Sequence, residues 1–210
     1  DAFDPATGRW TVLPDAPHAR DHFHAAVVDG KLYAAGGRRS AHDLGNALAQ
    51  TVAEVDVYDF KARRWSTLPA PLPTPRAGTA SAVIDGKLAV IGGESMKHEH
   101  AHREVEAWDP GAARWQSLPG LPVGRHGTQA ATQGGKVYLA AGSGNRGGGP
   151  ELNDLWVIQP GKLAARGYGR AMPRSSRPPG PSAHPGRAAA RRRRLHGVWW
   201  RSRFVVAALC

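Results

Sequence analysis

The stretch RAGTASAVIDGKLAVIGG, residues 76–93, decides the fold because the chain contains two more versions of it. These are RDHFHAAVVDGKLYAAGG at residues 20–37 and RHGTQAATQGGKVYLAAG at residues 125–142. Each version begins with an arginine and places two short, largely apolar runs around a central pair of turn residues. Internal repeats about 50 residues long indicate a solenoid or a propeller, in which each unit buries its apolar face against its neighbours.

A second phrase alternates with the first and sets the repeat length. It reads FDPATGRWTVLP, YDFKARRWSTLP and WDPGAARWQSLP, and it contains Trp10, Trp65 and Trp115, which are 55 and then 50 residues apart. In the first phrase, the arginine always stands sixteen positions before a pair of small residues. These pairs are Gly36 and Gly37, Gly92 and Gly93, and Ala141 and Gly142.

Each repeat predicts four antiparallel strands. In the first full copy, residues 24–28 and 31–35 are two strands joined at Asp29 and Gly30, residue types that tolerate the positive φ of a tight hairpin turn. A third strand follows over residues 54–59, and a fourth contains the tryptophan. Four such strands make one blade of a β-propeller.

These elements together resemble the Kelch repeats. The matching features are the glycine pair after the second strand, an aromatic residue in the third strand, and a tryptophan followed by Leu-Pro in the fourth. The resemblance covers residues 1–160 and implies an all-β fold, a partial Kelch-type β-propeller of four-stranded antiparallel blades. Galactose-oxidase-like propellers and sialic-acid-mutarotase-like proteins belong to the same structural group, so the resemblance leaves the function open.

The phase of the repeats predicts the domain organisation. Because the chain opens inside a third strand, we expect it to be a fragment of a larger propeller. The predicted parts are a half blade over residues 1–19, blades over residues 20–75 and 76–124, an incomplete blade over residues 125–160, and a tail over residues 161–210.

Charge separates the tail from the repeats. Residues 161–210 hold 12 of the 28 lysines and arginines and none of the 17 acidic residues, so residues 1–160 have a net charge of −1. We therefore expect no nucleic-acid partner for residues 1–160. The tail is rich in arginine, proline and alanine and is predicted to be disordered. We interpret it as the product of a reading-frame shift; the alternative is a cationic arm that binds nucleic acid or lipid.

The longest terminal apolar run, FVVAALC, has seven residues. A helix needs about 20 to span a bilayer, so we expect no membrane span. Cys210 is the only cysteine, so we expect no disulfide within the repeats.

The loops between the second and third strands predict a binding face. They cover residues 38–53, 94–103 and 143–152 and differ in length and sequence, whereas the hairpin turns are short and uniform. In a four-stranded blade all these loops emerge at the same end. Variable loops on a rigid scaffold usually carry binding specificity.

Arg20, Arg76 and Arg125 begin the first strands on that same face. We favour a packing role, in which each arginine bonds carbonyl groups of a neighbouring blade, because the residue recurs in every copy. The alternative is a ring of guanidinium groups that clamps ligand carboxylates through forked hydrogen bonds.

Three histidines beside the arginines, His22, His24 and His126, are further candidate binding residues. The positions of His22 and His24 are occupied by other residue types in the other copies, which singles these two out. The alternative is an ordinary role in the core.

His98, His100 and His102 alternate in KHEHAHRE and could approach one metal ion, since alternate residues of an extended segment share a face. We favour a solvated polar loop, because no cysteine or phased carboxylate joins the three histidines. We therefore expect no metal and no cofactor.

The tryptophans and glycine pairs are predicted to be structural, with Trp10, Trp65 and Trp115 packing between blades. The predicted function is a non-catalytic interaction module that binds a protein segment or a glycan on the loop face. The alternative is a portion of a galactose-oxidase-like or sialic-acid-mutarotase-like enzyme whose reaction centre lies elsewhere. Residues 1–160 contain no cysteine, so they cannot build the tyrosine–cysteine crosslink that the copper radical oxidases of this fold carry. The resemblance favours an extracytoplasmic location.

Overall fold

The computed structural model describes residues 1–40 and 49–159 of the chain. Within these ranges it contains thirteen strands and no α-helix, so nothing described here offers a helix long and apolar enough to cross a membrane. The described residues up to Asp15 form one compact unit, and those from Ala16 onward form another. The predicted tail, residues 161–210, lies outside the described residues together with both interpretations of it.

The first unit is a small antiparallel hairpin of β1 (Ala2–Asp4) and β2 (Arg9–Thr11). Phe3 and Trp10 lie opposite each other in this pairing, with ring centroids 5.0 Å apart. The Asp4 carboxylate accepts a hydrogen bond from the backbone N–H of Ala6 at 2.9 Å and thereby closes the turn.

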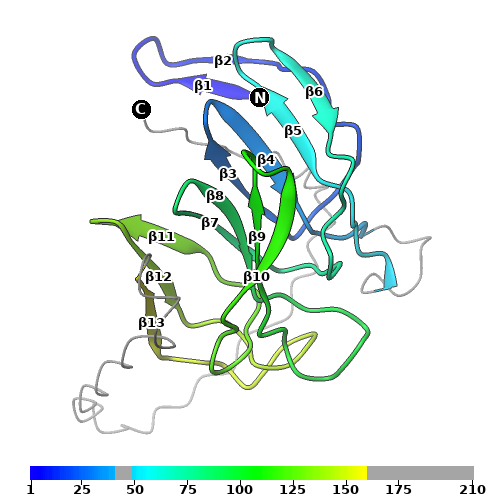
Figure 1. Ribbon diagram of the computed structural model, residues 1–210, viewed down its shortest axis with the longest axis vertical. Helices are drawn as coiled ribbons and strands as arrows, with labels where there is room; N and C mark the ends of the chain where they lie inside the picture. Colours follow the sequence, from blue (N-terminus) through cyan, green and yellow to red (C-terminus); the bar gives the residue numbers. More distant parts are fainter. Residues whose placement is uncertain (41–48, 160–210) are drawn as a thin grey trace, which may run out of the picture. The chain divides into compact units, whose positions relative to one another are not determined.

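The second unit consists of three antiparallel sheets whose strands follow chain order (Figure 1). This arrangement confirms the predicted all-β propeller blades. The first blade contains β3 (His24–Val28), β4 (Lys31–Ala35), β5 (Asp56–Asp59) and β6 (Arg64–Thr67). The second contains β7 (Ala80–Ile84), β8 (Lys87–Ile91), β9 (Val105–Asp109) and β10 (Arg114–Leu118). The third contains β11 (Ala130–Gln133), β12 (Lys136–Ala140) and β13 (Leu155–Ile158).

The predicted hairpin turns are confirmed by their backbone angles. Asp29 and Gly30 have φ of 48° and 69°, and Asp85 and Gly86 have φ of 49° and 73°. Positive φ at both central positions is the signature of the two-residue turn that matches the twist of antiparallel strands. The short first-to-second connections of the blades therefore follow directly from the Asp-Gly and Gly-Gly pairs.

The apolar core lies between the blades. In β8, Leu88 and Val90 pack into a cluster shared with the first blade, while Ala89 and Ile91 pack into one shared with the third blade. Successive side chains of a strand point to opposite faces of a sheet, so the second blade is buried on both faces. Fully burying a side chain such as Leu88 contributes about 1.5–3 kcal/mol. The stability of each blade therefore depends on its neighbours.

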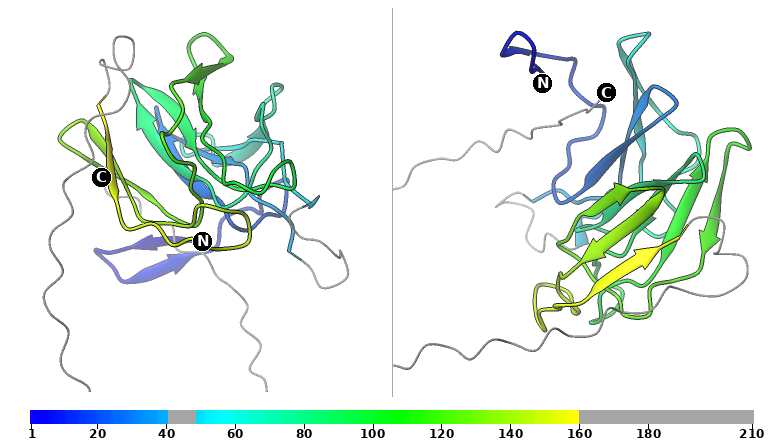
Figure 2. Two further views of the ribbon diagram at one scale, coloured as in Figure 1. Left: turned by 90° about the horizontal axis from the view of Figure 1, so that it is seen from below. Right: turned by 90° about the vertical axis from the view of Figure 1, so that its left-hand side faces the viewer.

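The first strands of the blades are the ones that meet: β7 contacts β3 on one side and β11 on the other (Figure 2). Backbone hydrogen bonds join them, from the Gly78 N–H to the His22 carbonyl at 2.6 Å and from the Gly127 N–H to the Gly78 carbonyl at 2.9 Å. These bonds hold the starts of the first strands together and place the segments around them on one face.

The glycine pairs are required by this close approach. A Cβ on Gly92 would lie 2.3 Å from the Arg125 carbonyl oxygen, and a Cβ on Gly36 would lie 2.8 Å from that of Arg76. The next glycine uses its N–H: Gly93 donates to the Arg125 carbonyl at 2.8 Å. The first glycine of a pair therefore leaves room for the backbone of the next blade, and the N–H of the second glycine donates a hydrogen bond to that backbone.

Candidate functional site

The long loops after β8 and β12 are joined by hydrogen bonds. The Ala101 N–H donates to the Gly144 carbonyl at 2.8 Å, and the Arg146 N–H donates to the Glu99 carbonyl at 2.7 Å. Figure 1 shows these loops on the side of the blades away from the β7–β8 and β11–β12 turns. Together with the loop after β4 they make up what we call the loop face: the described parts of residues 38–53, 94–103 and 143–152.

Glu94 connects all three blades on this face. Its carboxylate accepts a hydrogen bond from Arg38 Nη1 at 3.0 Å and another from the Gly147 N–H at 2.6 Å, and it lies 3.6 Å from His126 Nε2. The Glu94 side chain is only 4% exposed. A buried carboxylate needs such donors to offset its lost hydration, so Glu94 holds the three loop bases in fixed positions.

Arg76 is enclosed within its own blade. Its guanidinium group donates to the carbonyl oxygens of Gly92 at 2.6 Å and Val90 at 2.9 Å and forms an ion pair with Glu106. The residue has no exposed surface. The side chain thereby ties the start of the first strand to the second and third strands of the same sheet.

Arg20 and Arg125 have the same role. Arg20 donates to the carbonyl of Gly36 at 3.0 Å and pairs with Asp56 at 2.7 Å, while Arg125 donates to the carbonyl of Ala141 at 2.8 Å and pairs with Asp154 at 2.8 Å. Their side chains are 3% and 0% exposed.

Both predictions for the three arginines need correction. The proposed ring of ligand-clamping guanidinium groups is wrong, because the described residues already surround and pair these groups. The favoured packing role was assigned to the wrong contacts, because most of the carbonyls that Arg20, Arg76 and Arg125 bond belong to the arginine's own blade. The exception is the carbonyl of Thr74, in the connection before β7, which accepts from Arg76 at 2.7 Å. The neighbouring blade is reached through the backbone instead, where Gly37 donates to the Arg76 carbonyl at 2.9 Å.

The acidic partners of the arginines were missed by sequence reasoning, although a signal was present. In the strand pairing, Asp56 lies opposite Ala34 and Glu106 lies opposite Val90, two equivalent positions exactly 50 residues apart. The third blade has Trp156 at this position, and Asp154 replaces the missing acid from two residues earlier. In both copies the acid lies nine residues before the fourth-strand tryptophan, Trp65 or Trp115, and this recurrence could have revealed the pairs.

Burial opposes ionisation of Asp56, but hydrogen bonds from His18 and Thr67 and the charge of Arg20 outweigh it and hold the pKa of Asp56 below its usual value. For Asp154, the hydrogen bond from Arg125 is the largest influence and likewise lowers the pKa. Both carboxylates are therefore charged at neutral pH and keep the arginine anchors paired.

Of the three histidines near the arginines, His22 is the most unusual. It has a φ of 51°, a left-handed conformation, at the position where the other blades have Gly78 and Gly127. Such a conformation is uncommon for a residue other than glycine. His22 Nδ1 lies 2.5 Å from Asp21 Oδ1 and Nε2 lies 3.1 Å from Arg38 Nη2, so the exposed imidazole is held at the edge of the loop face.

The other two are less accessible. Burial lowers the pKa of His24, which lies in the first strand of its blade. His126 is largely buried, and its Nε2 donates to the Asn145 carbonyl at 2.7 Å. His126 therefore anchors the third loop, while His22 remains the candidate for contact with a ligand.

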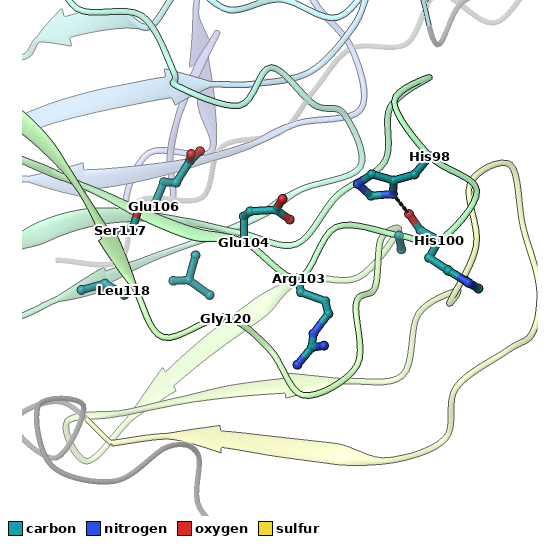
Figure 3. Close-up of a pocket in the computed structure, with 10 residues that line it drawn as sticks. His98, His100, Arg103, Glu104, Glu106, Ser117, Leu118 and Gly120 are labelled. Carbon is teal, nitrogen blue, oxygen red and sulfur yellow. Dashed lines mark hydrogen bonds between the residues drawn. The ribbon is translucent and has the colours of Figure 1, made fainter.

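The alternating histidines do not all turn to one point. His100 is directed away from His98 and bonds Asn145 Oδ1 through Nδ1 at 2.9 Å (Figure 3). His98 and His102 do come together, and Glu104 joins them, with one ligand atom from each residue lying within 4.8 Å of the others. The interpretation of this segment as a merely solvated polar loop is therefore wrong for His102, which is 1% exposed.

The tryptophans of the fourth strands differ in their surroundings. Trp115 lies opposite Trp108 within its own sheet and donates from Nε1 to the Ala70 carbonyl of the preceding blade at 3.2 Å. Trp65 is partly buried and lies beside Tyr58, with ring centroids 5.2 Å apart. Trp10, in the separate hairpin unit, is 52% exposed. Contact with a neighbouring blade is thus seen for Trp115.

Comparison with known proteins places the chain in a family. The model of the KLHDC2/KLHL20/DRC7 Kelch-repeats domain matches residues 2–142. Kelch-like protein terF of Aspergillus terreus is 31% identical over 147 residues, which are 69% of this chain and 32% of that protein. Beta-scruin of Limulus polyphemus is 26% identical over 164 residues, which are 74% of this chain and 17% of that protein. The chain thus spans a third or less of the length of these relatives.

The fold has a counterpart among solved structures. The structure of YjhT superimposes with a TM-score of 0.66 at 20% identity, covering 81% of this chain and 56% of that one. Since the family model covers most of the described residues and the repeats form propeller blades, the chain belongs to the Kelch-repeat family.

Proposed function

We propose that the chain is a non-catalytic interaction module that binds a segment of another protein on the loop face. The observation that carries this proposal is the cross-bonding of the loops after β8 and β12, which are joined through their backbones by the Ala101–Gly144 and Arg146–Glu99 hydrogen bonds. A surface already ordered before binding loses little conformational entropy when a partner docks.

The side chains on this face suit a protein ligand. Met96 is 43% exposed at the outer part of its loop, and Lys97 and Glu99 beside it are exposed as well. An apolar group surrounded by charges of both signs matches the anatomy of protein interfaces, with an apolar centre and a polar rim. One of the named relatives, terF, is a Kelch-like protein, which agrees with such a role.

A selection from a displayed peptide library tests the proposal. The full chain is the bait, and the dissociation constants of selected peptides are then measured for variants on the two ends of the blades. We expect Lys97→Glu, on the loop face, to weaken binding at least ~10-fold, equivalent to about 1.4 kcal/mol.

The matched control is Lys61→Glu in the turn between β5 and β6, which emerges at the opposite end of its blade. This substitution makes the same change of charge and is expected to leave the peptide affinity unchanged. Equal effects of the two variants would contradict the assignment to the loop face. Selection of no peptide, combined with saturable binding on a glycan array, would favour the glycan alternative.

A further inference from the structure

His98, His102 and Glu104 combine three metal-binding groups that the proposed interaction does not use. Two imidazoles and a carboxylate lie with one ligand atom each within 4.8 Å of one another. Two imidazoles and one carboxylate are a donor set typical of zinc sites. The chemistry of the cluster therefore resembles a metal centre more than a random surface contact.

A hydrogen bond orients the His98 ring in a way that suits metal binding. His98 Nδ1 lies 2.5 Å from the carbonyl oxygen of His100. The dashed line in Figure 3 marks this hydrogen bond. A carbonyl oxygen only accepts, so Nδ1 carries the proton and the lone pair is on Nε2. Metal-binding histidines almost always donate their other N–H to such a partner. His98 is thus held in the tautomer that a metal requires.

In His102 the roles of the two ring nitrogens are exchanged: Nε2 makes the supporting hydrogen bond, and Nδ1 is the proposed metal ligand. Its Nε2 lies 2.7 Å from Ser95 Oγ, a hydroxyl that can accept the imidazole proton, and its Nδ1 lies 3.1 Å from Glu104 Oε2. If Nε2–H donates to Ser95, the Nδ1 lone pair faces a carboxylate oxygen. In the metal-free chain a proton on Nδ1 makes this contact a hydrogen bond; when a cation binds both atoms, it takes the place of that proton.

The backbone under the cluster is anchored. The His102 N–H donates to the Gly93 carbonyl at 2.7 Å, and the Glu104 carbonyl accepts from the Gly92 N–H at 3.0 Å. Two of the three groups therefore stand on the rigid base of the loop, and His98 alone belongs to its exposed part. A metal ion would tie that outer part to the base.

The cluster also has access to solvent. His98 and Glu104 line a cavity of about 450 Å³ whose other wall includes Ser117 and Leu118 at the end of β10 (Figure 3). Water in this cavity can complete the coordination, as in zinc sites with three protein ligands and one open position.

We propose that His98 Nε2, His102 Nδ1 and the Glu104 carboxylate bind a divalent transition-metal ion, with Zn²⁺ as the best match. Zinc lies about 2.0–2.2 Å from nitrogen and oxygen ligands. The His102 and Glu104 atoms are already close enough to share an ion. A ligand atom of His98 lies within 4.8 Å of these two atoms, so the exposed His98 side chain moves inward to complete the set.

Calorimetric titration of the metal-free full chain with Zn²⁺ tests the proposal. Other histidines of the chain can bind Zn²⁺ weakly, so the decisive comparison is between His98→Ala and His100→Ala. Each variant removes one exposed imidazole from the same loop, but the His100 side chain is directed away from the cluster. We expect His98→Ala and Glu104→Gln to lose the tightest site and His100→Ala to keep it.

Co²⁺ provides a second readout, since its visible absorption reports the ligands directly. The chain and His100→Ala should develop the same bands, and His98→Ala should not, while circular dichroism checks that all variants remain folded. Equal Zn²⁺ affinity in His98→Ala and the unchanged chain would overturn the proposal. Loss of the site in His100→Ala would overturn it too.

Discussion

The three buried arginines and the loop face lie at the same end of the blades, yet they differ in whether they recur in each repeat and in whether they are buried. Arg20, Arg76 and Arg125 recur in every copy, are almost fully buried, and make their hydrogen bonds within their own sheets. The loops do not recur, and residues 96–100 are all exposed. In this molecule, the features that repeat hold the propeller together, and those that depart from the repeat are available to a ligand.

The largest expected effect is that of Arg76→Ala. Removing the guanidinium group leaves the buried Glu106 carboxylate without its charged partner, which costs about 3–5 kcal/mol of unfolding free energy. Urea denaturation measures the loss. Lys97→Ala on the loop face is the control and should change stability by no more than about 0.5 kcal/mol. If Arg76→Ala unfolded at the same urea concentration as the unchanged chain, the structural role of the anchor would be refuted.

The second prediction compares the stability costs of alanine at two glycines that have similar backbone angles. Gly92 and Gly86 have φ of 61° and 73°, so alanine costs about 1–2 kcal/mol at either from the left-handed backbone alone. At Gly92 the added Cβ also meets the Arg125 carbonyl oxygen, whereas at Gly86 nothing lies within 4 Å. We expect Gly92→Ala to be worse than Gly86→Ala by a further ~1–3 kcal/mol. Equal thermal melting of the two variants would contradict the close approach of the blades.

Acid should weaken the anchors through Asp56. Its pKa is lower in the folded chain than its ordinary value of about 3.9, so its contribution to stability is complete above that pH. The contribution is lost as the pH falls through the folded pKa. Denaturation measured from pH 5 down to pH 2 should therefore show a steeper loss in the unchanged chain than in Asp56→Asn. Parallel curves would mean that the Asp56–Arg20 pair adds no acid-sensitive stability.

The smallest effect is expected for Trp115→Phe. This change removes the hydrogen bond from Nε1 to the Ala70 carbonyl and should cost about 1 kcal/mol. Trp10 occupies the same position in its repeat but is half exposed, so Trp10→Phe should cost less. Thermal melts of the two variants make the comparison. A larger cost at Trp10 would show that position in the repeat, rather than burial, decides the contribution.

Much of the fold could be predicted because its signals are local. The Asp-Gly pairs readily adopt the positive φ of a tight hairpin turn, and strands β3 and β4 begin and end as expected. The third strand of the first blade is slightly shorter than expected: β5 begins at Asp56 rather than at residue 54, and the Glu54 carbonyl instead accepts a hydrogen bond from Arg20.

The candidate site was less predictable because it depends on contacts between distant residues. The sequence shows that the arginines and two of the acids recur, but not that Arg76 pairs with Glu106. It shows three alternating histidines, but not that His100 turns toward Asn145 while Glu104 takes its place in the cluster. Which side chains meet depends on their rotamers and on the neighbouring loops, and neither can be read from the spacing of residues in the sequence.

The sequence by itself determined the repeat, its four-stranded unit, the hairpin turns and the end of the blades at which the variable loops emerge. Each follows from the conformational preferences of single residues or from strict alternation along a strand. The tertiary structure alone decided which polar groups are buried and paired and which face solvent. That division depends on the folding of each blade around its arginine and on the close approach of neighbouring blades, which together leave His22, Met96 and His98 exposed.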